Sequence, residues 1–467
     1  MITLAKPPSD MFSKVFSLTT VAEVYDKDIA WKNIQGIDRI SHDQFDRLKS
    51  EHFDIILKKC LDGSYNYSPF LEKLRLRGRN RNPRVISIAT IRDRIVLSLL
   101  KDYLHNIFPE CVNRRLPNSY INEIKKFYEA TTLKDLCLYK VDIKAFYDNI
   151  NHTKLLEILA ERIKFKPDMV LIKHAIETQT VTSDYRRSNL KEKRNLRGVP
   201  QGLAVSNILA NIYFHHCDEI FKTNSILYLR YVDDILFVVK NSDQESIKSL
   251  VNDKLRELDL SSNKEKTVCI PIHSDIDYLG YHLKLPTVSI KNVTVERYLR
   301  SLSALFSAYA SRGPTGIYPQ VDEQIGKQLF ISDLNEKITG AISENKRFGW
   351  LFYFLEMNDL PLLYRIDLLI RNKFLNRLKD PKTRPVPEDI KKLSRSYYES
   401  KYDPFGGYIH NYDEYDTISK KMQYLVLRGI IKKDGGKTYQ SSEIERLFNR
   451  FKKKRLSSLE ADVGETS

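Results

Sequence analysis

Three aspartates stand where a carboxylate is costly to leave without a partner. Asp142 lies near the end of the apolar segment 136–143 (LCLYKVDI), and Asp233 and Asp234 lie at the centre of 226–239 (ILYLRYVDDILFVV). A buried carboxylate costs free energy unless it is paired or binds a metal, and adjacent carboxylates repel unless a cation is near. Taken singly, each aspartate is more commonly a helix cap or a turn residue. Taken together, they predict a divalent-metal site.

A glycine-rich turn lies between these aspartates in the sequence. Residues 197–207 read RGVPQGLAVSN, in which two glycines bracket Pro-Gln ahead of a helix-forming stretch. Glycine lets the backbone approach a ligand closely, and Gln201 at such a turn can hydrogen-bond a base or a sugar. An ordinary loop-to-helix junction would read the same way. The order of a strand-end aspartate, a glycine-rich helix start and an acidic hairpin favours the functional interpretation.

The elements that must position these residues are short strands and helices. Residues 136–143 and 226–239 are predicted as strands, the second folding into a hairpin at the acidic pair. Residues 155–163 and 204–221 have helical periodicity. Helices packed on a mostly antiparallel sheet give an α+β core.

A basic hairpin is predicted upstream of this core. Residues 71–88 (LEKLRLRGRNRNPRVISI) alternate apolar and basic side chains around a turn at 78–83 that is rich in Gly, Asn and Pro. This alternation is typical of a β-hairpin with a cationic face. Helical periodicity returns over 91–108.

The chain after Pro286 is predicted to be mostly helical. Its strongest helical segments are 298–310 and 350–378, and breaks at 380–387 (DPKTRPVP) and 403–407 (DPFGG) set off a C-terminal unit. Proline and glycine clusters of this kind end helices and mark joints between units.

That C-terminal unit carries two candidate nucleic-acid elements. Residues 425–439 predict a helix followed by a short hairpin, as in a winged helix, and 446–455 (RLFNRFKKKR) predict a basic amphipathic helix. A solvated charged helix is the alternative for the second. The tail from Glu460 is polar and predicted to be disordered. The tyrosines from Tyr364 onward leave a protein-primed start open, since a tyrosine hydroxyl can act as a nucleophile.

Composition narrows the class of protein. Among 467 residues, Lys and Arg number 76 against 60 Asp and Glu, a net charge of +16 that favours a polyanionic partner. No run of eighteen apolar residues exists and the first residues lack a signal-peptide pattern, so we expect a cytoplasmic protein without a membrane partner. Five widely spaced cysteines argue against a disulfide framework or a structural zinc.

Five ordered motifs resemble the palm of group II intron-like bacterial reverse transcriptases. They are VDIKAFYDNINH, RGVPQGLAVSNILANIYF, LRYVDDILFVV, NKEKT and DYLGYHL. Upstream, NIQGIDRIS (33–41), YNYSPF (65–70) and RVISIATIRDRIV (84–96) resemble the N-terminal region and fingers of that lineage. The resemblance covers about 19–283.

The resemblance implies an α+β right-hand polymerase with fingers, a palm built on an antiparallel sheet, a helical thumb and a mostly α-helical C-terminal domain. It divides the chain into an N-terminal region with fingers (1–135), a palm that includes fingers elements (136–285), a thumb-like helical region (286–378) and a C-terminal domain (379–467) with the basic helix and disordered tail.

The resemblance also implies the metal ligands. Asp142 and Asp233 would bind two Mg²⁺ ions, with Mn²⁺ as the alternative, and Asp234 would complete the catalytic set. The carbonyl of Ile143 would add a further oxygen. Hard oxygen ligands of this kind select Mg²⁺ or Mn²⁺ over softer metals.

Nucleotide and primer contacts follow from the same motifs. Tyr147 matches the steric gate that excludes a 2′-hydroxyl, with Phe146 as the competing candidate. Core packing is the alternative for either ring, and a solvated cation is the alternative for each basic residue. The other implied contacts are Gln201 and Gly202 in the nucleotide and template pocket, Lys266 at the pyrophosphate, Arg84 with Arg75 or Arg77 at the triphosphate, and Leu279 and Gly280 in the primer grip.

The implied function is an RNA-directed DNA polymerase that adds dNTPs on an RNA template and holds an RNA–DNA duplex. The Asn-Ala-x-x-His and Val-Thr-Gly elements of retron enzymes and the Cys/His pattern of intron endonucleases are not found in the sequence. This favours the stand-alone abortive-infection-like and unknown-group enzymes, which act in antiphage defence, often with a cognate non-coding RNA. A group II intron maturase-type or retron-type enzyme, an RNA-binding scaffold with dispensable polymerase activity, and an RNA-dependent RNA polymerase remain alternatives, and a homo-oligomer is left open.

Overall fold

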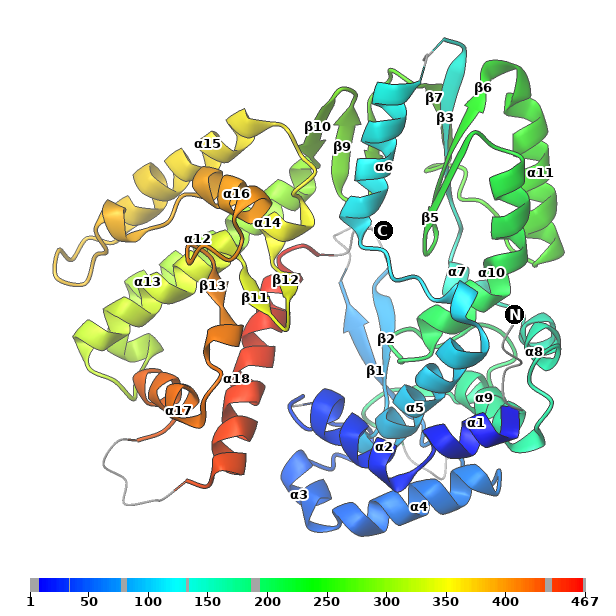
Figure 1. The fold of residues 1–467 in the computed structure, drawn as a ribbon, viewed down its shortest axis with the longest axis horizontal. Coiled ribbons are helices and arrows are strands. Elements are labelled where there is room, and N and C mark those ends of the chain that lie inside the picture. The colour runs from blue at the N-terminus through cyan, green and yellow to red at the C-terminus, as the bar shows by residue number, and fades with distance from the viewer. Residues whose placement is uncertain are drawn as a thin grey trace. The chain divides into compact units, whose positions relative to one another are not determined.

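The computed structural model describes residues 8–32, 34–76, 82–131, 134–185, 194–432 and 439–464. The chain forms two compact units, each built from two separate stretches of sequence (Figure 1). Unit 1 comprises residues 1–114 and 134–272, and unit 2 comprises 115–133 and 273–467. Residues 115–133, expected with the N-terminal region, therefore group with the C-terminal half of the chain.

Unit 1 is built on a four-stranded antiparallel sheet in the order β5-β6-β3-β7. The strands are β3 (Leu136–Asp142), β5 (Leu227–Tyr231), β6 (Asp234–Lys240) and β7 (Val268–Pro271). The predicted strand at 136–143 and the predicted hairpin at the acidic pair are both confirmed. In the β3–β6 register Asp142 lies directly opposite Asp234.

The two faces of this sheet differ because alternate side chains point in opposite directions. One face packs into the main core of the unit together with α10 (Ser206–Thr223) and α11 (Gln244–Glu257) (Figure 1). The strand residues in that core are Cys137, Tyr139, Val141, Ile235, Phe237 and Val239. The alternation places Asp142 and Asp234 together on the opposite face, away from that core.

The predicted basic hairpin is also confirmed. β1 (Phe70–Arg75) pairs antiparallel with β2 (Arg84–Ile88), and β4 (Thr180–Val181) lies parallel to β1 on its other side. The turn residues 77–81 lie outside the described part of the chain. The helix expected after the hairpin is α5 (Ile91–Ile107), whose N-cap Thr90 accepts a hydrogen bond from the Asp93 N–H.

The remaining helices of unit 1 surround this framework. They are α1 (Pro8–Val15), α2 (Leu18–Val24), η1 (Tyr25–Ile29), α3 (His42–Arg47), α4 (Lys49–Leu61), η2 (Pro109–Cys111), α7 (Phe146–Asn149), α8 (His152–Ala160), α9 (Lys166–Glu177) and η4 (Asn241–Asp243).

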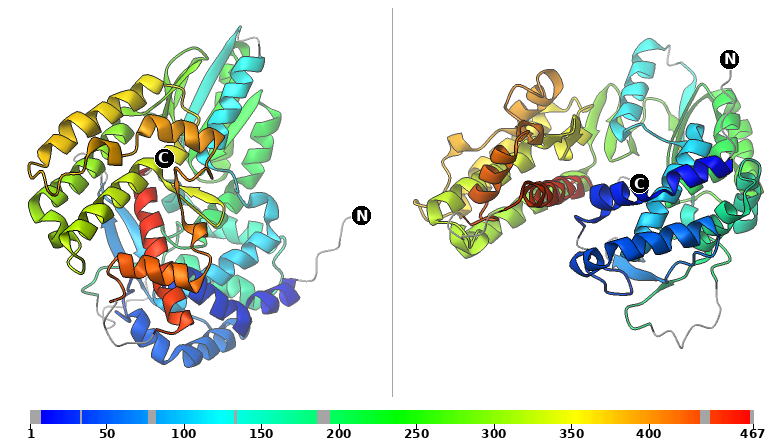
Figure 2. Two further views of the ribbon diagram at one scale, coloured as in Figure 1. Left: turned by 60° about the vertical axis from the view of Figure 1, so that its left-hand side comes forward. Right: turned by 60° about the horizontal axis from the view of Figure 1, so that its bottom comes forward.

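Unit 2 combines helices with two small sheets (Figure 2). Its helices are α6 (Pro117–Ala130), α12 (Asn292–Ile317), α13 (Glu323–Thr339), α14 (Trp350–Tyr353), α15 (Leu360–Leu369), η5 (Ile370–Phe374), η6 (Leu375–Arg377), η7 (Pro387–Asp389), α16 (Leu393–Tyr402), η8 (Tyr412–Glu414), α17 (Ile418–Leu427) and α18 (Ser441–Ala461). Its strands are β8 (Ile276–Tyr278), β9 (Tyr281–Lys284), β10 (Thr287–Ile290), β11 (Ala341–Ser343), β12 (Lys346–Phe348) and β13 (His410–Asn411).

The helix expected over 350–378 is interrupted. α14 ends at Tyr353, and α15 starts only after Asp359, whose side chain accepts a hydrogen bond from the Leu362 N–H. Pro361 in the first turn of α15 lacks an N–H, which suits a helix start and not a helix interior. A local N-cap therefore outweighs the continuous apolar periodicity of this stretch.

The C-terminal helix differs from the expectation in two respects. α18 runs to Ala461 and Val463 is buried, so the disorder expected from Glu460 does not hold for residues 460–464. The buried apolar residues of α18 and the ion pair between Asp462 and Lys337 hold this end on the unit. Of the segment 425–439, predicted as a helix followed by a short hairpin, only residues 425–427 are helical, as the end of α17, and residues 433–438 lie outside the described part.

The basic side of α18 is partly structural. Arg455 pairs with Glu336 and Asp333, and Lys452 pairs with Glu344. None of the described helices combines the length and apolarity needed to span a membrane.

Candidate active site

The end of β3 carries the first aspartate and a lysine partner. Asp142 is buried, and the Lys266 Nζ lies 2.6 Å from its Oδ1. The Asn263 N–H donates to the Asp142 carbonyl at 2.7 Å, and the Lys266 N–H donates to the Asn263 carbonyl at 3.1 Å. This turn ties the predicted NKEKT motif to the strand end. Lys266 is therefore a neighbour of the carboxylate, not simply a solvated cation.

The hairpin between β5 and β6 presents the acidic pair. Its turn has Val232 at a φ of 58°, the positive value that a two-residue type II′ turn requires at its first central position. A β-branched residue rarely adopts this conformation, and such strain is typical of functional sites. The Arg230 Nη1 donates to the Val232 carbonyl at 3.0 Å, and Arg230 pairs with Asp218 at 2.6 Å. A nearly buried ion pair thus holds the strained turn.

Burial governs the electrostatics of the acidic pair. It raises the pKa of Asp234 to about 7, against the opposing charge of Lys140, whose Nζ lies 3.9 Å from Asp234 Oδ1. Burial likewise raises the pKa of Asp233, and the negative charge of Asp142 raises it further. Carboxylates in this setting are more stable as anions when a cation joins them.

The donor atoms fit a hard divalent cation. The three carboxylates supply oxygens, and the Ile143 N–H donates to the Asp233 carbonyl at 3.3 Å, which ties the two strand ends together. Oxygen-only donors suit Mg²⁺ or Mn²⁺. The ions expected from the sequence would therefore be held by Asp142, Asp233 and Asp234, with the Ile143 carbonyl next to Asp142.

A different trio lies closer together. Among the described residues, the group of three whose metal-binding atoms all lie within 4.8 Å of one another is Glu110, Cys111 and His215. Arg162 lies 2.6 Å from Glu110, and burial raises the pKa of the Cys111 thiol to about 12. Because one ligand is already paired and the thiolate is disfavoured, we assign no metal to this group.

The structure separates the two steric-gate candidates. Phe146 is buried and its ring packs against Phe214 with centroids 5.8 Å apart, which is the core-packing alternative. Tyr147 is only partly buried, and its pKa is raised to about 12 by burial and then by the charge of Asp233. Tyr147 is therefore the less buried of the two rings, and the charge of Asp233 acts on its hydroxyl.

The glycine-rich turn joins this aromatic residue to the basic hairpin. The Val199 N–H donates to the Tyr147 carbonyl at 2.8 Å, and the Ser87 N–H of β2 donates to the Gln201 carbonyl at 2.7 Å. Gly202 has a φ of 100°, and a Cβ there would lie 2.7 Å from Ile86 Cγ2. A side chain at this position is excluded by both strain and space.

The Gln201 side chain has a partner that the sequence did not indicate. Its Nε2 donates to Asp148 Oδ1 at 3.0 Å, which links the turn to α7 next to Tyr147. Any base or sugar contact of Gln201 would therefore share its amide with Asp148.

The two predicted arginines face each other across the hairpin. Arg75 and Arg84 are direct cross-strand partners, so their side chains lie on the same face. The charge of Arg84 opposes the raised pKa of both Asp233 and Tyr147. Arg77, the alternative partner, lies outside the described residues.

The predicted primer-grip hairpin is present in unit 2. Leu279 and Gly280 have φ values of 48° and 81°, the two positive values of a type I′ turn, between β8 and β9. The Tyr353 hydroxyl donates to the Leu279 carbonyl at 3.2 Å, and the Lys291 N–H donates to that of Gly280 at 3.0 Å. Both turn carbonyls are therefore held by hydrogen bonds.

Sequence reasoning missed two supporting groups. Lys140 was not singled out, although its spacing of two from Asp142 puts both side chains on one face of β3. The Arg230–Asp218 pair joins β5 to α10. Arg230 lies within the LRYVDDILFVV motif, whereas Asp218 lies outside all five motifs, so nothing in the sequence pointed to this partner.

Comparison with known proteins agrees with this geometry. Residues 75–283, a little under half of the chain, match the family described as reverse transcriptase (RNA-dependent DNA polymerase). Over this stretch the chain is similar to reverse transcriptases. All the predicted catalytic residues lie within this stretch, and the predicted α+β class is confirmed by the helices and sheets of the structure.

Curated relatives of the chain are intron-encoded. The group II intron-encoded protein LtrA of Lactococcus lactis is 20% identical over 53% of this chain and 52% of its own length. A putative COX1/OXI3 intron 2 protein of Saccharomyces cerevisiae is 22% identical over 51% of this chain and 35% of its own. The chain spans about half or less of the length of these relatives.

Solved structures of telomerase are also similar. Apo telomerase from Candida tropicalis aligns with 90% of this chain and 76% of its own at 17% identity and a TM-score of 0.39. Telomerase from Candida albicans with a fragment of telomeric RNA aligns with 79% of this chain and 68% of its own, at 14% identity and a TM-score of 0.39. Similarities this weak do not bear on substrate or partner.

Proposed function

We propose that this chain is an RNA-directed DNA polymerase that extends a primer by two-metal phosphoryl transfer. The observation that carries the proposal is the convergence of Asp142, Asp233 and Asp234 at the end of the β3–β6 pair, inside the stretch that is similar to reverse transcriptases. The buried, pKa-raised acidic pair and its oxygen-only donor set support a cation site there.

Each residue near this site has a proposed task. Asp142 and Asp233 hold the reacting centre, and Asp234 adds charge from β6. Two bound divalent cations would supply activation of the primer 3′-hydroxyl and stabilisation of the leaving pyrophosphate. Lys266, now 2.6 Å from Asp142, donates a proton to that pyrophosphate.

The walls of the site select and orient the nucleotide. Tyr147 lies under the sugar and excludes a 2′-hydroxyl, while Gln201 and Gly202 form the turn against which base and template rest. Arg84 and Arg75 present two guanidinium groups to the triphosphate, which is anionic. Leu279 and Gly280 form the hairpin that supports the primer.

RNA-templated primer extension tests this function. The purified chain with an RNA template, a DNA primer, dNTPs and Mg²⁺ should make labelled DNA, and Asp233→Asn should abolish it. Asp253→Asn is the matched control, because Asp253 is an exposed residue of α11. Retained synthesis by the Asp233 variant would rule out the assigned site.

We further propose a role in antiphage defence, with a cognate non-coding RNA as template, in the cytoplasm. The retron elements are not found within the 467 residues, which favours this over a retron-type enzyme, and five free cysteine thiols are consistent with a reducing compartment. Cells expressing the chain should resist phage, and Asp142→Ala should abolish resistance. Equal protection by that variant would favour an RNA-binding scaffold whose polymerase activity is dispensable.

A further inference from the structure

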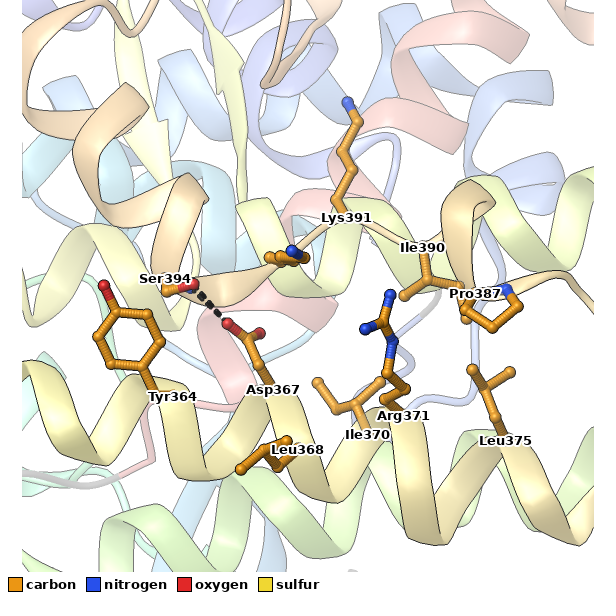
Figure 3. A pocket seen from close by; sticks show the side chains of 11 residues that line it. Tyr364, Asp367, Leu368, Ile370, Arg371, Leu375, Pro387, Ile390, Lys391 and Ser394 are labelled. Carbon is orange, nitrogen blue, oxygen red and sulfur yellow. Dashed lines mark hydrogen bonds between the residues drawn. The ribbon is translucent and has the colours of Figure 1, made fainter.

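A pocket in unit 2 lies outside the stretch that is similar to reverse transcriptases. It is formed between α15 with η5 on one side and the segment leading into α16 on the other, and has a volume of about 290 Å³ (Figure 3). Its lining combines an aromatic residue, aliphatic side chains and several cations. The family match ends at residue 283 and assigns no role to it.

The back of the pocket is rigidly built around Asp367. Its carboxylate accepts hydrogen bonds from the N–H groups of Leu393 at 2.6 Å and Ser394 at 3.0 Å. It also accepts one from the Ser394 hydroxyl at 2.6 Å (Figure 3). A side chain of α15 thus caps the first turn of α16. Because this carboxylate already accepts three hydrogen bonds within the protein, its negative charge is largely offset without any ligand.

Two cations of the pocket, Arg371 and Lys392, form no ion pair with a described carboxylate. Within the described residues, neither Arg371 nor Lys392 has a carboxylate within salt-bridge distance, and both side chains are exposed. Lys391 contributes mainly its aliphatic stem, because its Nζ donates to the Tyr408 carbonyl. Arg371 points from η5 toward the facing segment (Figure 3). Two cations against one hydrogen-bonded carboxylate favour an anionic ligand.

An apolar surface continues from these cations toward Tyr364. Tyr364 is 52% exposed and Leu368 is 57% exposed, one turn apart on α15, and both line the pocket. Seven residues separate Tyr364 from Arg371, about 10 Å along a helix. An exposed ring at one end and a guanidinium at the other match a planar base joined to a phosphate.

Two further exposed aromatic residues lie on α16, the helix that follows the pocket segment. Tyr398 and Tyr402 lie four and eight residues after Ser394, on the same stripe of the helix, and are 41% and 72% exposed. Their rings are stacked with centroids 6.4 Å apart. Successive exposed rings near cations are typical of surfaces that bind single-stranded nucleic acid. A free mononucleotide would use only the pocket.

We propose that this pocket binds one nucleotide of a single-stranded RNA, with its base against Tyr364 and its phosphate on Arg371 and Lys392. The site anchors an RNA strand through unit 2. The proposal rests on RNA being a partner of the chain, as the proposed function requires, but not on polymerisation.

Site-specific crosslinking tests the location. The full chain carrying Asp233→Asn is mixed with a single-stranded RNA containing 5-iodouridine, irradiated, and digested for mass spectrometry. We expect a crosslinked peptide that contains Tyr364 and that disappears in Tyr364→Ala. Crosslinks confined to residues 75–283 would overturn the proposal.

Affinity for the same RNA tests the contacts. We expect Tyr364→Ala and Arg371→Ala each to weaken binding about tenfold, Tyr364→Phe to bind like the parent chain, and the Arg371 change to lower the salt dependence by about one ion. Arg365→Ala is the matched control, because Arg365 is an exposed arginine of α15 that does not line the pocket. Equal losses for Arg365→Ala and Arg371→Ala would show a general charge effect and overturn the site.

A competition arm distinguishes the RNA strand from a free nucleotide. UMP should displace the labelled RNA only at concentrations far above those at which an unlabelled RNA strand does. Displacement by UMP at equal concentration would overturn the strand assignment. Since all binding is measured on the Asp233→Asn chain, failure of the polymerase assay would leave these results unchanged.

Discussion

Lys266 has one partner in this structure and a different partner in the proposed reaction. Its ammonium lies 2.6 Å from Asp142 in this structure, whereas the proposed reaction requires it at the leaving pyrophosphate. The sequence placed Lys266 near the site through the NKEKT motif. The direct contact with Asp142 could not be predicted, since it depends on how the turn after Asn263 folds back on β3.

Replacing Lys266 tests its proposed role as a proton donor. We expect Lys266→Ala to lower kcat about 100-fold, the usual range for loss of a general acid. Lys264→Ala is the control, as an exposed lysine of the same motif. Steady-state kinetics with dNTP titration measure kcat and KM for each variant. Equal effects of the two alanine variants would argue against a specific role.

Tyr147 and Phe146 are adjacent, and sequence alone could not decide between them. Ala145 precedes α7 with a φ of 47°, and this bend determines which ring enters the core. We expect Tyr147→Ala to reduce the preference for dNTP over NTP by about 10- to 100-fold.

Phe146→Ala should instead destabilise the fold by about 3–5 kcal/mol, because its ring is buried. Urea unfolding and competitive incorporation of dNTP and NTP separate the two effects. Relaxed sugar selection in the Phe146 variant, with none in the Tyr147 variant, would reverse the assignment.

Asp168 provides a pH-dependent test of the fold. Its Oδ2 accepts a hydrogen bond from the Tyr103 hydroxyl, and within the described residues its Oδ1 has no hydrogen-bond partner. Burial raises its pKa from 3.8 to about 6, against the opposing effect of Tyr103. Between about pH 4 and 6 the folded chain therefore keeps a proton that the unfolded chain releases. This group's contribution to stability is present at low pH and is lost as the pH rises through 6.

Asp168→Asn should remove that loss. We expect the variant to gain stability relative to the wild type between pH 4.5 and 7, on the order of 1 kcal/mol. Urea unfolding at several pH values measures the difference. Asp93, whose pKa burial also raises to about 6, is common to both proteins and cancels in the comparison. A constant difference across this range would contradict the assignment.

At the scale of elements, local patterns were predicted better than distant partners. The β1–β2 and β5–β6 hairpins were predicted because alternation and turn residues lie within one short segment. The ion pairs of Arg455 and Lys452 were not, because Glu336 and Glu344 lie more than a hundred residues earlier in the chain. Because Arg455 and Lys452 are paired, the basic side chains of α18 that remain exposed include Arg446, Arg450 and Lys454.

The pair of Arg230 and Asp218 links the strained catalytic turn to α10. Both side chains are close to buried, so removing one partner leaves an uncompensated charge. We expect Asp218→Ala to destabilise the chain by about 3–5 kcal/mol and to lower primer extension, because Arg230 also holds the Val232 carbonyl.

The adjacent residue on α10 supplies the control. Glu219 pairs with Lys222 on the exposed surface, and Glu219→Ala should change stability by less than about 1 kcal/mol. Chemical unfolding and extension assays on both variants make the comparison. If the Asp218 variant were as stable and active as the Glu219 variant, the turn would not depend on this pair.

At the scale of the whole molecule, composition and motif order set the function class but not the division into units. The charge of +16 and the five motifs pointed to nucleic-acid chemistry. The grouping of residues 115–133 with 273–467 is a tertiary feature that no segment of the sequence shows. The pocket of unit 2 could not be predicted from the sequence either. Its lining comes from α15, η5 and the segment before α16, and these stretches carry no motif.

The central claim is that Asp142, Asp233 and Asp234 form the metal-dependent site of an RNA-directed DNA polymerase. The most direct test is single-turnover extension of a DNA primer on an RNA template by the wild-type chain, Asp233→Asn and Asp253→Asn, with equal folding verified by thermal melts. We predict a rate loss of roughly three orders of magnitude for Asp233→Asn alone, since loss of a metal-binding carboxylate costs several kcal/mol of transition-state stabilisation. Extension by Asp233→Asn at the rate of the Asp253→Asn control would contradict the account.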